Sequence, residues 1–154
     1  MAEELELVEF YLYLQNSRFR DKITYEIKYH GEELKKDLIP RLLIEPLVEN
    51  AVSHGLEPKE GNGRVCVELY EEGENLHILV EDDGVGFEED PEEMEPEKEG
   101  HTHTGLENTR RLLYILYGDR HRWKVSGKKG EGTKVEIVIP VERGEEDVES
   151  NGSR

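Results

Sequence analysis

The sequence predicts an α+β fold in which helices cover one face of a mixed sheet of about five strands. Apolar residues recur at helical spacing in some segments and alternate with polar residues in others. The helical segments are residues 3–17, 41–54 and 105–117. The strand segments are residues 22–29, 64–70, 76–82, 122–126 and 133–140. Because the last strands follow one another closely enough to form hairpins, we expect the helices to pack on one side of the sheet.

The first two elements are a helix and a strand. In residues 3–17, Leu5, Val8 and Leu12 recur at helical spacing. Residues 22–29 alternate instead, which places one apolar face on a strand. The residues of that face are Ile23, Tyr25, Ile27 and Tyr29.

The second helix, residues 41–54, follows Pro40, a residue that can open a helix from its first turn. Pro46 either kinks this helix or marks its true start, and Gly55 supplies a stop. The apolar arc of the helix consists of Ile44, Leu47, Val48, Ala51 and Val52.

The middle of the chain predicts a hairpin and a long loop. Residues 64–70 and 76–82 flank a turn at Gly73–Glu74–Asn75. Residues 83–104 are rich in glycine, proline and acids, and loops of this length are usually functional lids or disordered. Helical spacing resumes in residues 105–117, Gly118 ends the helix, and two strands close the domain.

Charge and length exclude several classes of function. The chain has 154 residues, enough for one core, and its 20 basic and 37 acidic residues give a net charge of −17. This charge disfavours nucleic acid and direct contact with an anionic membrane. The apolar runs are too short to cross a bilayer, and Cys66 is the only cysteine, which excludes an internal disulfide.

The acids gather in two segments, of which the first lies within the domain and the second marks its end. Residues 88–99 hold eight acids against Lys98, and residues 142–149 hold five against Arg143. Because like-charged runs are usually solvated, we expect one domain over residues 1–141 and a disordered acidic tail over 142–154.

Four motifs could carry chemistry. The first is Glu49–Asn50 with His54, where Asn50 and His54 are four residues apart and share a helix face. An amide oxygen and a carboxylate are hard ligands of the kind that magnesium accepts. A solvated polar face would show the same spacing.

The second motif, Asp82–Asp83–Gly84–Val85–Gly86–Phe87, follows a strand. Gly84 and Gly86 allow a sharp turn and the close approach of a ligand, while Asp82 could accept a hydrogen bond from an amine on a base. A simple Asp-Gly turn is the alternative.

The third motif, Gly100–His101–Thr102–His103–Thr104–Gly105–Leu106, opens a helix. Free N–H groups at a helix N-terminus favour phosphate, and a plain helix cap is the alternative. The two histidines lack the further ligands that a metal site needs. The fourth motif, Gly130–Glu131–Gly132–Thr133, is by itself only a glycine hairpin.

The order of the four motifs resembles the ATP-binding domain shared by gyrase, heat-shock chaperone, histidine kinase and mismatch-repair ATPases, the Bergerat fold. Three stretches are close to the LytS-type sensor histidine kinases, and the resemblance covers roughly residues 4–140. These stretches are ELELVEFYLYLQNSRF (Glu4–Phe19), PRLLIEPLVENAVSHG (Pro40–Gly55) and GLENTRRLLYILYG (Gly105–Gly118). The resemblance implies a two-layer α/β sandwich with ATP between the helices and a mobile lid.

The resemblance implies a role for each motif residue. Asn50 would hold the Mg²⁺ that bridges the ATP phosphates, with the Glu49 carboxylate beside it and His54 near the phosphates. Asp82 would accept the adenine amino group. Three further residues would complete the adenine side: Gly84, Gly86 and Thr133.

The same resemblance implies that residues 87–104 form the ATP lid. At its end, Thr104 and the backbone N–H groups of Gly105 and Leu106 would contact the phosphates, with Asn108 close behind. Magnesium and the helix dipole would offset the repulsion between ATP and an acidic chain.

Three departures from the family pattern stand out. His103 and Thr104 lie where the family usually has glycines, and Ser53 lies where it often has lysine. The phosphoacceptor histidine of such kinases lies on an upstream helical hairpin, and no histidine here has a matching context.

The function predicted is therefore the catalytic domain of a two-component sensor histidine kinase, using ATP and Mg²⁺. Its expected partners are the upstream phosphoacceptor hairpin and a response regulator. The domain itself is expected to be monomeric and cytoplasmic, as part of a membrane-bound sensor. The alternatives are an anti-sigma-type serine kinase of the same fold and a degenerate, non-enzymatic nucleotide- or partner-binding domain.

Overall fold

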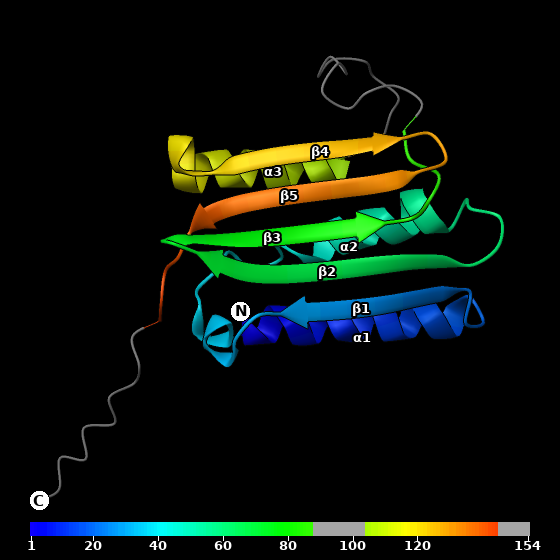
Figure 1. Cartoon of the computed structure of the whole chain (residues 1–154), viewed down its shortest axis with the longest axis horizontal. Coiled ribbons are helices and arrows are strands. Elements are labelled where there is room, and N and C mark those ends of the chain that lie inside the picture. Colours follow the sequence, from blue (N-terminus) through cyan, green and yellow to red (C-terminus); the bar gives the residue numbers. More distant parts are fainter. Residues whose placement is uncertain (88–103, 145–154) are drawn as a thin grey trace, which may run out of the picture.

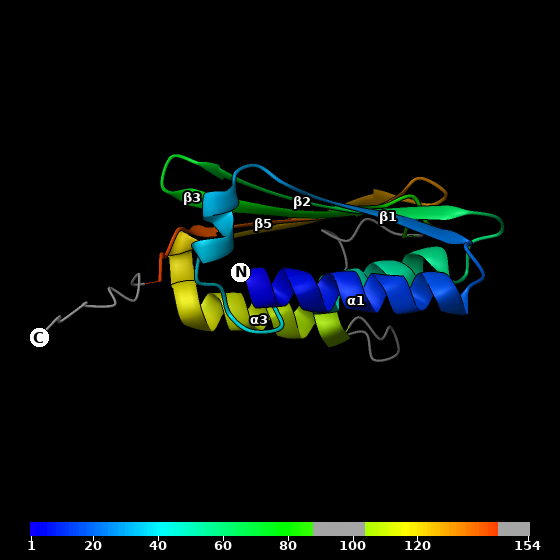
Figure 2. The ribbon, with the colours of Figure 1, turned by 90° about the horizontal axis from the view of Figure 1, so that it is seen from below.

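The structure, a computed structural model, describes residues 1–87 and 104–144. Its sheet has five strands in the order β1-β2-β3-β5-β4, in which β1 and β2 are parallel and the other neighbours are antiparallel. The helices α1, α2 and α3 lie on one face of this sheet (Figures 1 and 2). The predicted α+β fold with helices on one face of a mixed five-stranded sheet is confirmed.

The strands follow the alternation of the sequence closely. They are β1 (Ile23–Tyr29), β2 (Gly63–Glu72), β3 (Asn75–Asp82), β4 (Arg122–Lys128) and β5 (Gly132–Pro140). In β3, the alternate residues Leu76, Ile78, Val80 and Asp82 are buried. Asn75 pairs with Glu72 and is the first residue of β3, so the turn consists of Gly73, whose φ is 63°, and Glu74. The sequence had assigned Asn75 to the turn.

The helices α1 (Ala2–Arg18) and α3 (Thr104–Tyr117) match their predicted segments. Leu5, Val8 and Leu12 of α1 are buried, as their spacing predicts. Gly118, with φ 53°, follows α3 in the left-handed conformation that glycine tolerates.

The helix predicted over residues 41–54 is wrong at both ends. The α-helix α2 spans only Glu45–Asn50, with Pro46 in its first turn, so Pro46 marks the true start. Residues Ala51–Leu56 continue as a π-helix, labelled η2, and Gly55 lies inside it instead of stopping it. In a π-helix the hydrogen bonds run from residue i+5 to residue i, as from Glu57 N to Val52 O at 2.8 Å. The i,i+4 relation expected for Asn50 and His54 is therefore not that of a regular α-helix.

A buried carboxylate from α1 caps α2. Glu4 Oε1 accepts hydrogen bonds from the backbone N–H groups of Ile44 at 2.9 Å and Glu45 at 3.2 Å, and Oε2 accepts one from Leu42 at 3.1 Å. The first turn of a helix has N–H groups without intrahelical partners, so this carboxylate supplies the missing acceptor. Glu4 thereby joins α1 to the start of α2.

The C-terminal segment is held as far as the structure describes it. Leu38 N donates to Glu142 O at 2.6 Å, Gly144 N donates to Lys36 O at 3.3 Å, and Arg143 forms an ion pair with Glu71 at 2.9 Å. The remaining tail, residues 145–154, lies outside the described residues, and so do residues 88–103 of the predicted lid. The predicted tail and lid stay predictions.

Candidate nucleotide-binding site

Asp82, the last residue of β3, lies at the centre of a tightly packed strand end. Its side chain is only 5% exposed, and its Oδ1 accepts a hydrogen bond from Gly84 N at 2.8 Å. Gly55 of η2 lies against both Asp82 and Gly84. A hydrogen bond from Val85 N to Gly55 O, at 3.0 Å, holds the two segments together. A Cβ built on Gly55 would lie 2.5 Å from Asp82 Oδ1, and one built on Gly84 would lie 2.2 Å from Gly55 O. Only glycine fits at these two positions, so the π-helix and the strand end hold the Asp82 carboxylate together.

The glycine hairpin between β4 and β5 closes on the same strand end. Gly132 has φ 88°, and a Cβ there would lie 1.9 Å from Asp82 O. Gly86 has φ 70°, and a Cβ there would lie 2.0 Å from Lys128 O. Gly130 N donates to Val85 O at 2.7 Å. Two motifs that are far apart in sequence therefore pack backbone against backbone.

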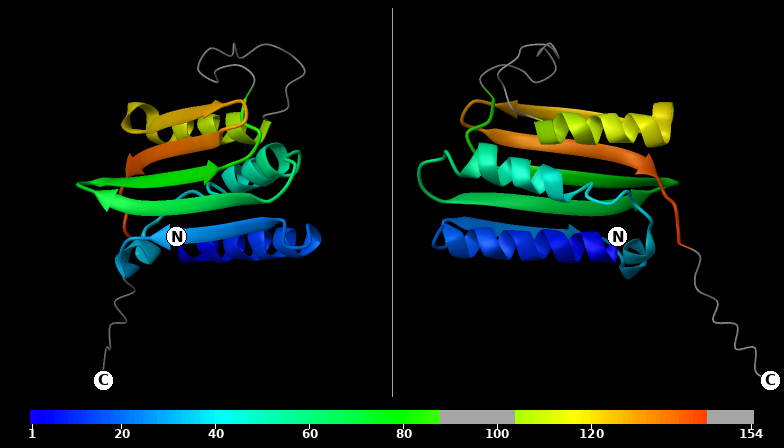
Figure 3. Two further views of the ribbon diagram at one scale, coloured as in Figure 1. Left: turned by 45° about the vertical axis from the view of Figure 1, so that its right-hand side comes forward. Right: turned by 180° about the vertical axis from the view of Figure 1, so that it is seen from behind.

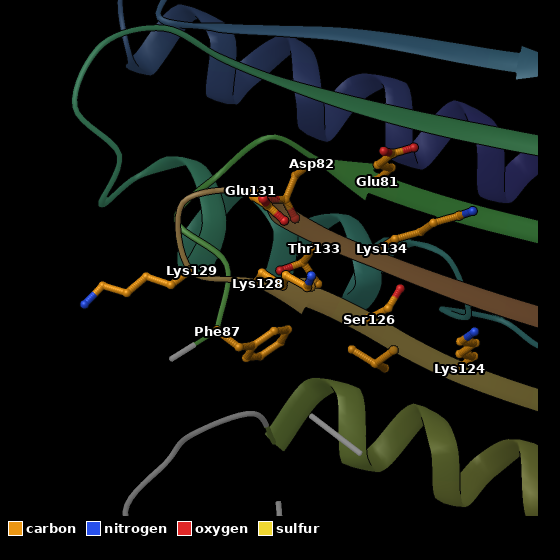
Figure 4. Close-up of a pocket in the computed structure, with 13 residues that line it drawn as sticks. Glu81, Asp82, Phe87, Lys124, Ser126, Lys128, Lys129, Glu131, Thr133 and Lys134 are labelled. Atoms are coloured by element: carbon orange, nitrogen blue, oxygen red, sulfur yellow. The ribbon is translucent and has the colours of Figure 1, made fainter. Parts of the chain in front are cut away.

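A pocket of about 580 Å³ opens beside Asp82 (Figure 4). Thr133, the register partner of Asp82 across β3 and β5, lines it, as do Gly132 and Phe87. Four lysines and three acids also lie along its wall: Lys124, Lys128, Lys129, Lys134, Glu81, Asp82 and Glu131. The pocket wall is therefore close to neutral in a chain of net charge −17, and an anionic ligand would meet little repulsion there.

Burial controls the protonation of Asp82. Loss of hydration raises the pKa of its carboxyl from the ordinary 3.8 to about 6, and the charges of Asp83 and Glu81 act in the same direction. The backbone N–H groups of Gly84 and Thr133 oppose this shift because they stabilise the ionised form. At neutral pH the carboxylate is mostly ionised, and so it is an acceptor for a hydrogen-bond donor in the pocket.

This raised pKa predicts a pH-dependent stability. The folded chain binds a proton at Asp82 more tightly than the unfolded chain, so between about pH 4 and pH 6 this group lowers the free energy of unfolding as the pH rises. The full cost above pH 6 is about 3 kcal/mol. Asp82→Asn removes this dependence, which urea unfolding at a series of pH values measures as the wild-type minus variant difference.

A second buried acid, Asp37, titrates in the same pH range, but it does not disturb that measurement. Burial and the neighbouring Glu71 carboxyl also raise its pKa to about 6, so it contributes with the same sign in both proteins and cancels in the difference. Parallel stability curves for the wild type and Asp82→Asn over this pH range would contradict the shift at Asp82.

The residues of the first motif lie at the same end of the molecule but outside this pocket. The π-helix η2, the end of β3, the β4–β5 hairpin and the start of α3 share this end (Figures 1 and 3). Asn50 is half-buried, whereas Glu49 and His54 are exposed. Glu49 lies close enough to α1 that its charge, after the larger effect of burial, helps raise the pKa of Tyr11 to about 12.

The third motif is described from the start of α3. Leu106 is buried, while Gly105 and Asn108 are exposed, and Thr109 Oγ1 donates to Gly105 O at 2.9 Å. Thr104 is the first helical residue. None of these residues lines the pocket beside Asp82 in the part of the chain that the structure describes. The structure thus joins Asp82, Gly84 and Thr133 directly and packs Gly86 against the β4–β5 hairpin beside them. The other predicted residues lie around the same end.

Three contributors were not predicted for the site. The sequence analysis assigns no site role to any of them: Gly55 is expected as a helix stop, Gly132 as part of a hairpin, and Phe87 as the last residue of the second motif and the first of the lid. The double glycine at 130 and 132 was the sequence signal for Gly132, because two such glycines indicate an unusually tight backbone approach.

Comparison with known proteins identifies the family of this domain. The model of the family of histidine kinase-, DNA gyrase B- and HSP90-like ATPases matches residues 35–143. The chain belongs to this family. Membership implies that it binds ATP, and it confirms the predicted ATP-binding domain, whereas the LytS subtype stays a prediction.

Relatives of this ATPase domain include sensor kinases. The sensor protein kinase HptS of Staphylococcus aureus strain USA300 is 31% identical over 153 residues, which cover 96% of this chain and 29% of the relative. The chain therefore spans less than a third of that relative.

Solved structures of histidine kinases share the fold of the domain. The histidine kinase domain of the blue-light activated kinase from Erythrobacter litoralis EL346 has a TM-score of 0.60 and 24% identity, over 87% of this chain and 63% of that one. The nucleotide-free catalytic domain of the histidine kinase ThkA has a TM-score of 0.64 and 18% identity, over 88% and 90%.

Proposed function

We propose that this ATPase domain is the catalytic domain of a sensor histidine kinase and that Asp82 selects adenine within it. The observation that carries the proposal is the buried Asp82 carboxylate, which faces a pocket and is held by Gly55 and Gly84. An ionised acceptor in a desolvated position favours a ligand with an amino group there, such as the 6-amino group of adenine. Thr133 beside it would complete the contacts to the base.

The phosphates would extend from this pocket toward α2 and the start of α3. The exposed N-terminal turn of α3, with Gly105 and Asn108, offers backbone N–H groups to an anion. His54 would lie near the phosphates on the side of η2. We keep residues 87–104 as the ATP lid in this proposal, although residues 88–103 lie outside the part of the chain that the structure describes.

The side chains of α2 could supply only some of the ligands that a Mg²⁺ ion needs. Asn50 offers an amide oxygen and Glu49 a carboxylate, which are hard ligands suited to this ion. Among residues 1–87 and 104–144, no group of three or more His, Cys, Asp or Glu could hold a metal ion. We infer that Asn50 supplies one ligand to a Mg²⁺ that otherwise depends on the phosphates and water, and that the ion neutralises charge on the transferred group.

The chemistry proposed is transfer of the γ-phosphoryl group to a histidine nitrogen, with ADP leaving. It needs an acceptor histidine on a helical hairpin of the parent protein, and a response regulator that then takes the phosphoryl group. Such a transfer asks for positioning and charge stabilisation, not for a covalent intermediate on this domain. None of the helices in the described part of the chain combines the length and the apolar character of a membrane span. Because the relatives of the domain include a sensor protein kinase, we propose that it acts on the cytoplasmic side of a sensor.

Phosphotransfer provides the test of this function. The domain with Mg-ATP should phosphorylate an added peptide that carries a kinase phosphoacceptor hairpin, and the product should be labile in acid, as a phosphohistidine is. Calorimetry with ATP is run in parallel. Nucleotide binding without transfer would favour the non-enzymatic alternative, and an acid-stable product on a serine would favour the serine kinase.

Asn50→Ala should reduce the gain in ATP affinity that Mg²⁺ provides more than it reduces the affinity for ATP without Mg²⁺. Loss of one ligand weakens the hold on the ion without closing the adenine pocket, so the gain in ATP affinity on adding Mg²⁺ should shrink by about tenfold. Calorimetry with ATP, in magnesium and in chelator, measures this gain. Asn75→Ala, at the far end of β3, is the matched control and should keep the whole gain. A full magnesium gain in Asn50→Ala would assign the ion to another residue, Glu49 first.

A further inference from the structure

Helix α1 is apolar on its outer side as well as its inner side. Its inner side buries Leu5, Val8 and Leu12 against the rest of the domain. Its outer side exposes large apolar side chains, which are Leu7 at 41%, Phe10 at 61%, Tyr13 at 61% and Leu14 at 46%. Single exposed apolar residues are ordinary, but four on two successive turns of one helix indicate a contact surface.

These residues form an ordered row, which we name the α1 stripe: Glu3, Leu7, Phe10, Leu14 and Arg18. Steps of three and four residues place all five on one side of the helix. Glu3 and Arg18 are both exposed. The row therefore carries an acid at its amino end, a base at its carboxyl end and apolar side chains between them.

No other described segment covers this side of α1. The helix lies along one margin of the helical layer, with its outer surface open (Figures 2 and 3). Leu42, which is 55% exposed and whose N–H donates to Glu4 of α1, adds an apolar side chain next to the helix. The surface is long and narrow, a shape that suits another helix.

We propose that the α1 stripe pairs antiparallel with the α1 stripe of a second copy of this chain. A two-fold axis near Phe10 would place Phe10 against its own copy and Leu7 against Leu14 of the other copy. The same axis would place Glu3 against Arg18 at both ends. The order of charged and apolar residues in the stripe is thus complementary to itself when reversed, whereas parallel pairing would bring like charges together.

The reversed charge order is what favours a second copy over a different partner. A partner helix of other sequence would need a matching base and acid at the ends, and the stripe already contains both. The apolar part is short, so the interface is small and the dimer is weak. The sequence by itself predicts a monomer, so a dimer would be a new property of the chain. The proposal is independent of the nucleotide site, because the α1 stripe and the Asp82 pocket consist of different residues.

Sedimentation equilibrium of the whole chain over a wide range of concentrations tests the proposal. The wild type should show a reversible dimer, and Phe10→Ser should weaken it at least tenfold. Ile115→Ser is the matched control, because Ile115 is 70% exposed on α3 but lies outside the stripe, and it should leave the dimer unchanged. Circular dichroism and ATP calorimetry show that each variant folds and binds nucleotide.

Charge reversal tests the antiparallel arrangement. Glu3→Arg and Arg18→Glu should each weaken the dimer at low salt, while the double variant, which exchanges the two charges, should restore it. Mixing the two single variants should also restore association, since each then supplies what the other lacks. The proposal would be overturned if the wild type stayed monomeric at every concentration. This holds also if it bound a helix of another protein without pairing with itself. A dimer that Phe10→Ser leaves intact, or a double variant that stays as weak as the single ones, would overturn it too.

Discussion

Asp82→Asn should lower the affinity for ATP and ADP by about 10- to 150-fold, while the fold remains intact. A hydrogen bond to a charged acceptor contributes about 1.5–3 kcal/mol, which corresponds to that range of affinity. The Asn side chain can present an N–H donor where the carboxylate offers only acceptors, so the adenine amino group would lose its partner. Calorimetry with both nucleotides at neutral pH measures the effect.

Asp83→Asn is the matched control for this prediction. The Asp83 side chain is exposed, and its Oδ1 accepts a hydrogen bond from Arg64 N at 2.7 Å, an interaction that an amide oxygen can keep. Its nucleotide affinity should stay within about twofold of the wild type, a difference below about 0.5 kcal/mol.

The thermal midpoint of Asp82→Asn should not fall, because the cost of burying a charge disappears. Equal affinities for the wild type and Asp82→Asn would remove Asp82 from adenine recognition.

Gly132→Ala should be strongly destabilising. A left-handed backbone costs a residue with a Cβ about 1–2 kcal/mol, and forcing a methyl group into a filled space costs about 1–3 kcal/mol more. The new Cβ would lie 1.9 Å from Asp82 O, so the hairpin or the strand end must move. Urea unfolding should show a loss of about 2–5 kcal/mol, and nucleotide affinity should fall with it.

Gly130→Ala separates backbone strain from steric overlap. Gly130 has φ 80°, close to the 88° of Gly132, but nothing lies within 4 Å of the Cβ that alanine would add. It should therefore lose only the strain, about 1–2 kcal/mol. Equal losses for Gly130→Ala and Gly132→Ala would mean that the contact with Asp82 contributes nothing to stability.

The regular elements and the acid at the end of β3 were predictable because their signals are local. Alternation predicts a strand over residues 76–82 that ends at Asp82, and in the structure Asp82 lies on the buried face of this strand with Ile78 and Val80. The order of the four motifs was enough to identify the ATPase family. The position of Asn50 relative to the pocket beside Asp82 was not predictable, since it depends on the π-helix that replaces the expected α-helical turn.

The sequence by itself determined the fold class, the family and the presence of a carboxylate at the end of the strand that became β3. Only the tertiary structure decided how that carboxylate is held. Gly55 and Gly84 meet across 29 residues of chain, and Glu4 caps the start of α2 at Ile44, 40 residues away. Spacing within one segment carries no information about such contacts, because they depend on how the whole α1–α2 pair packs on the sheet.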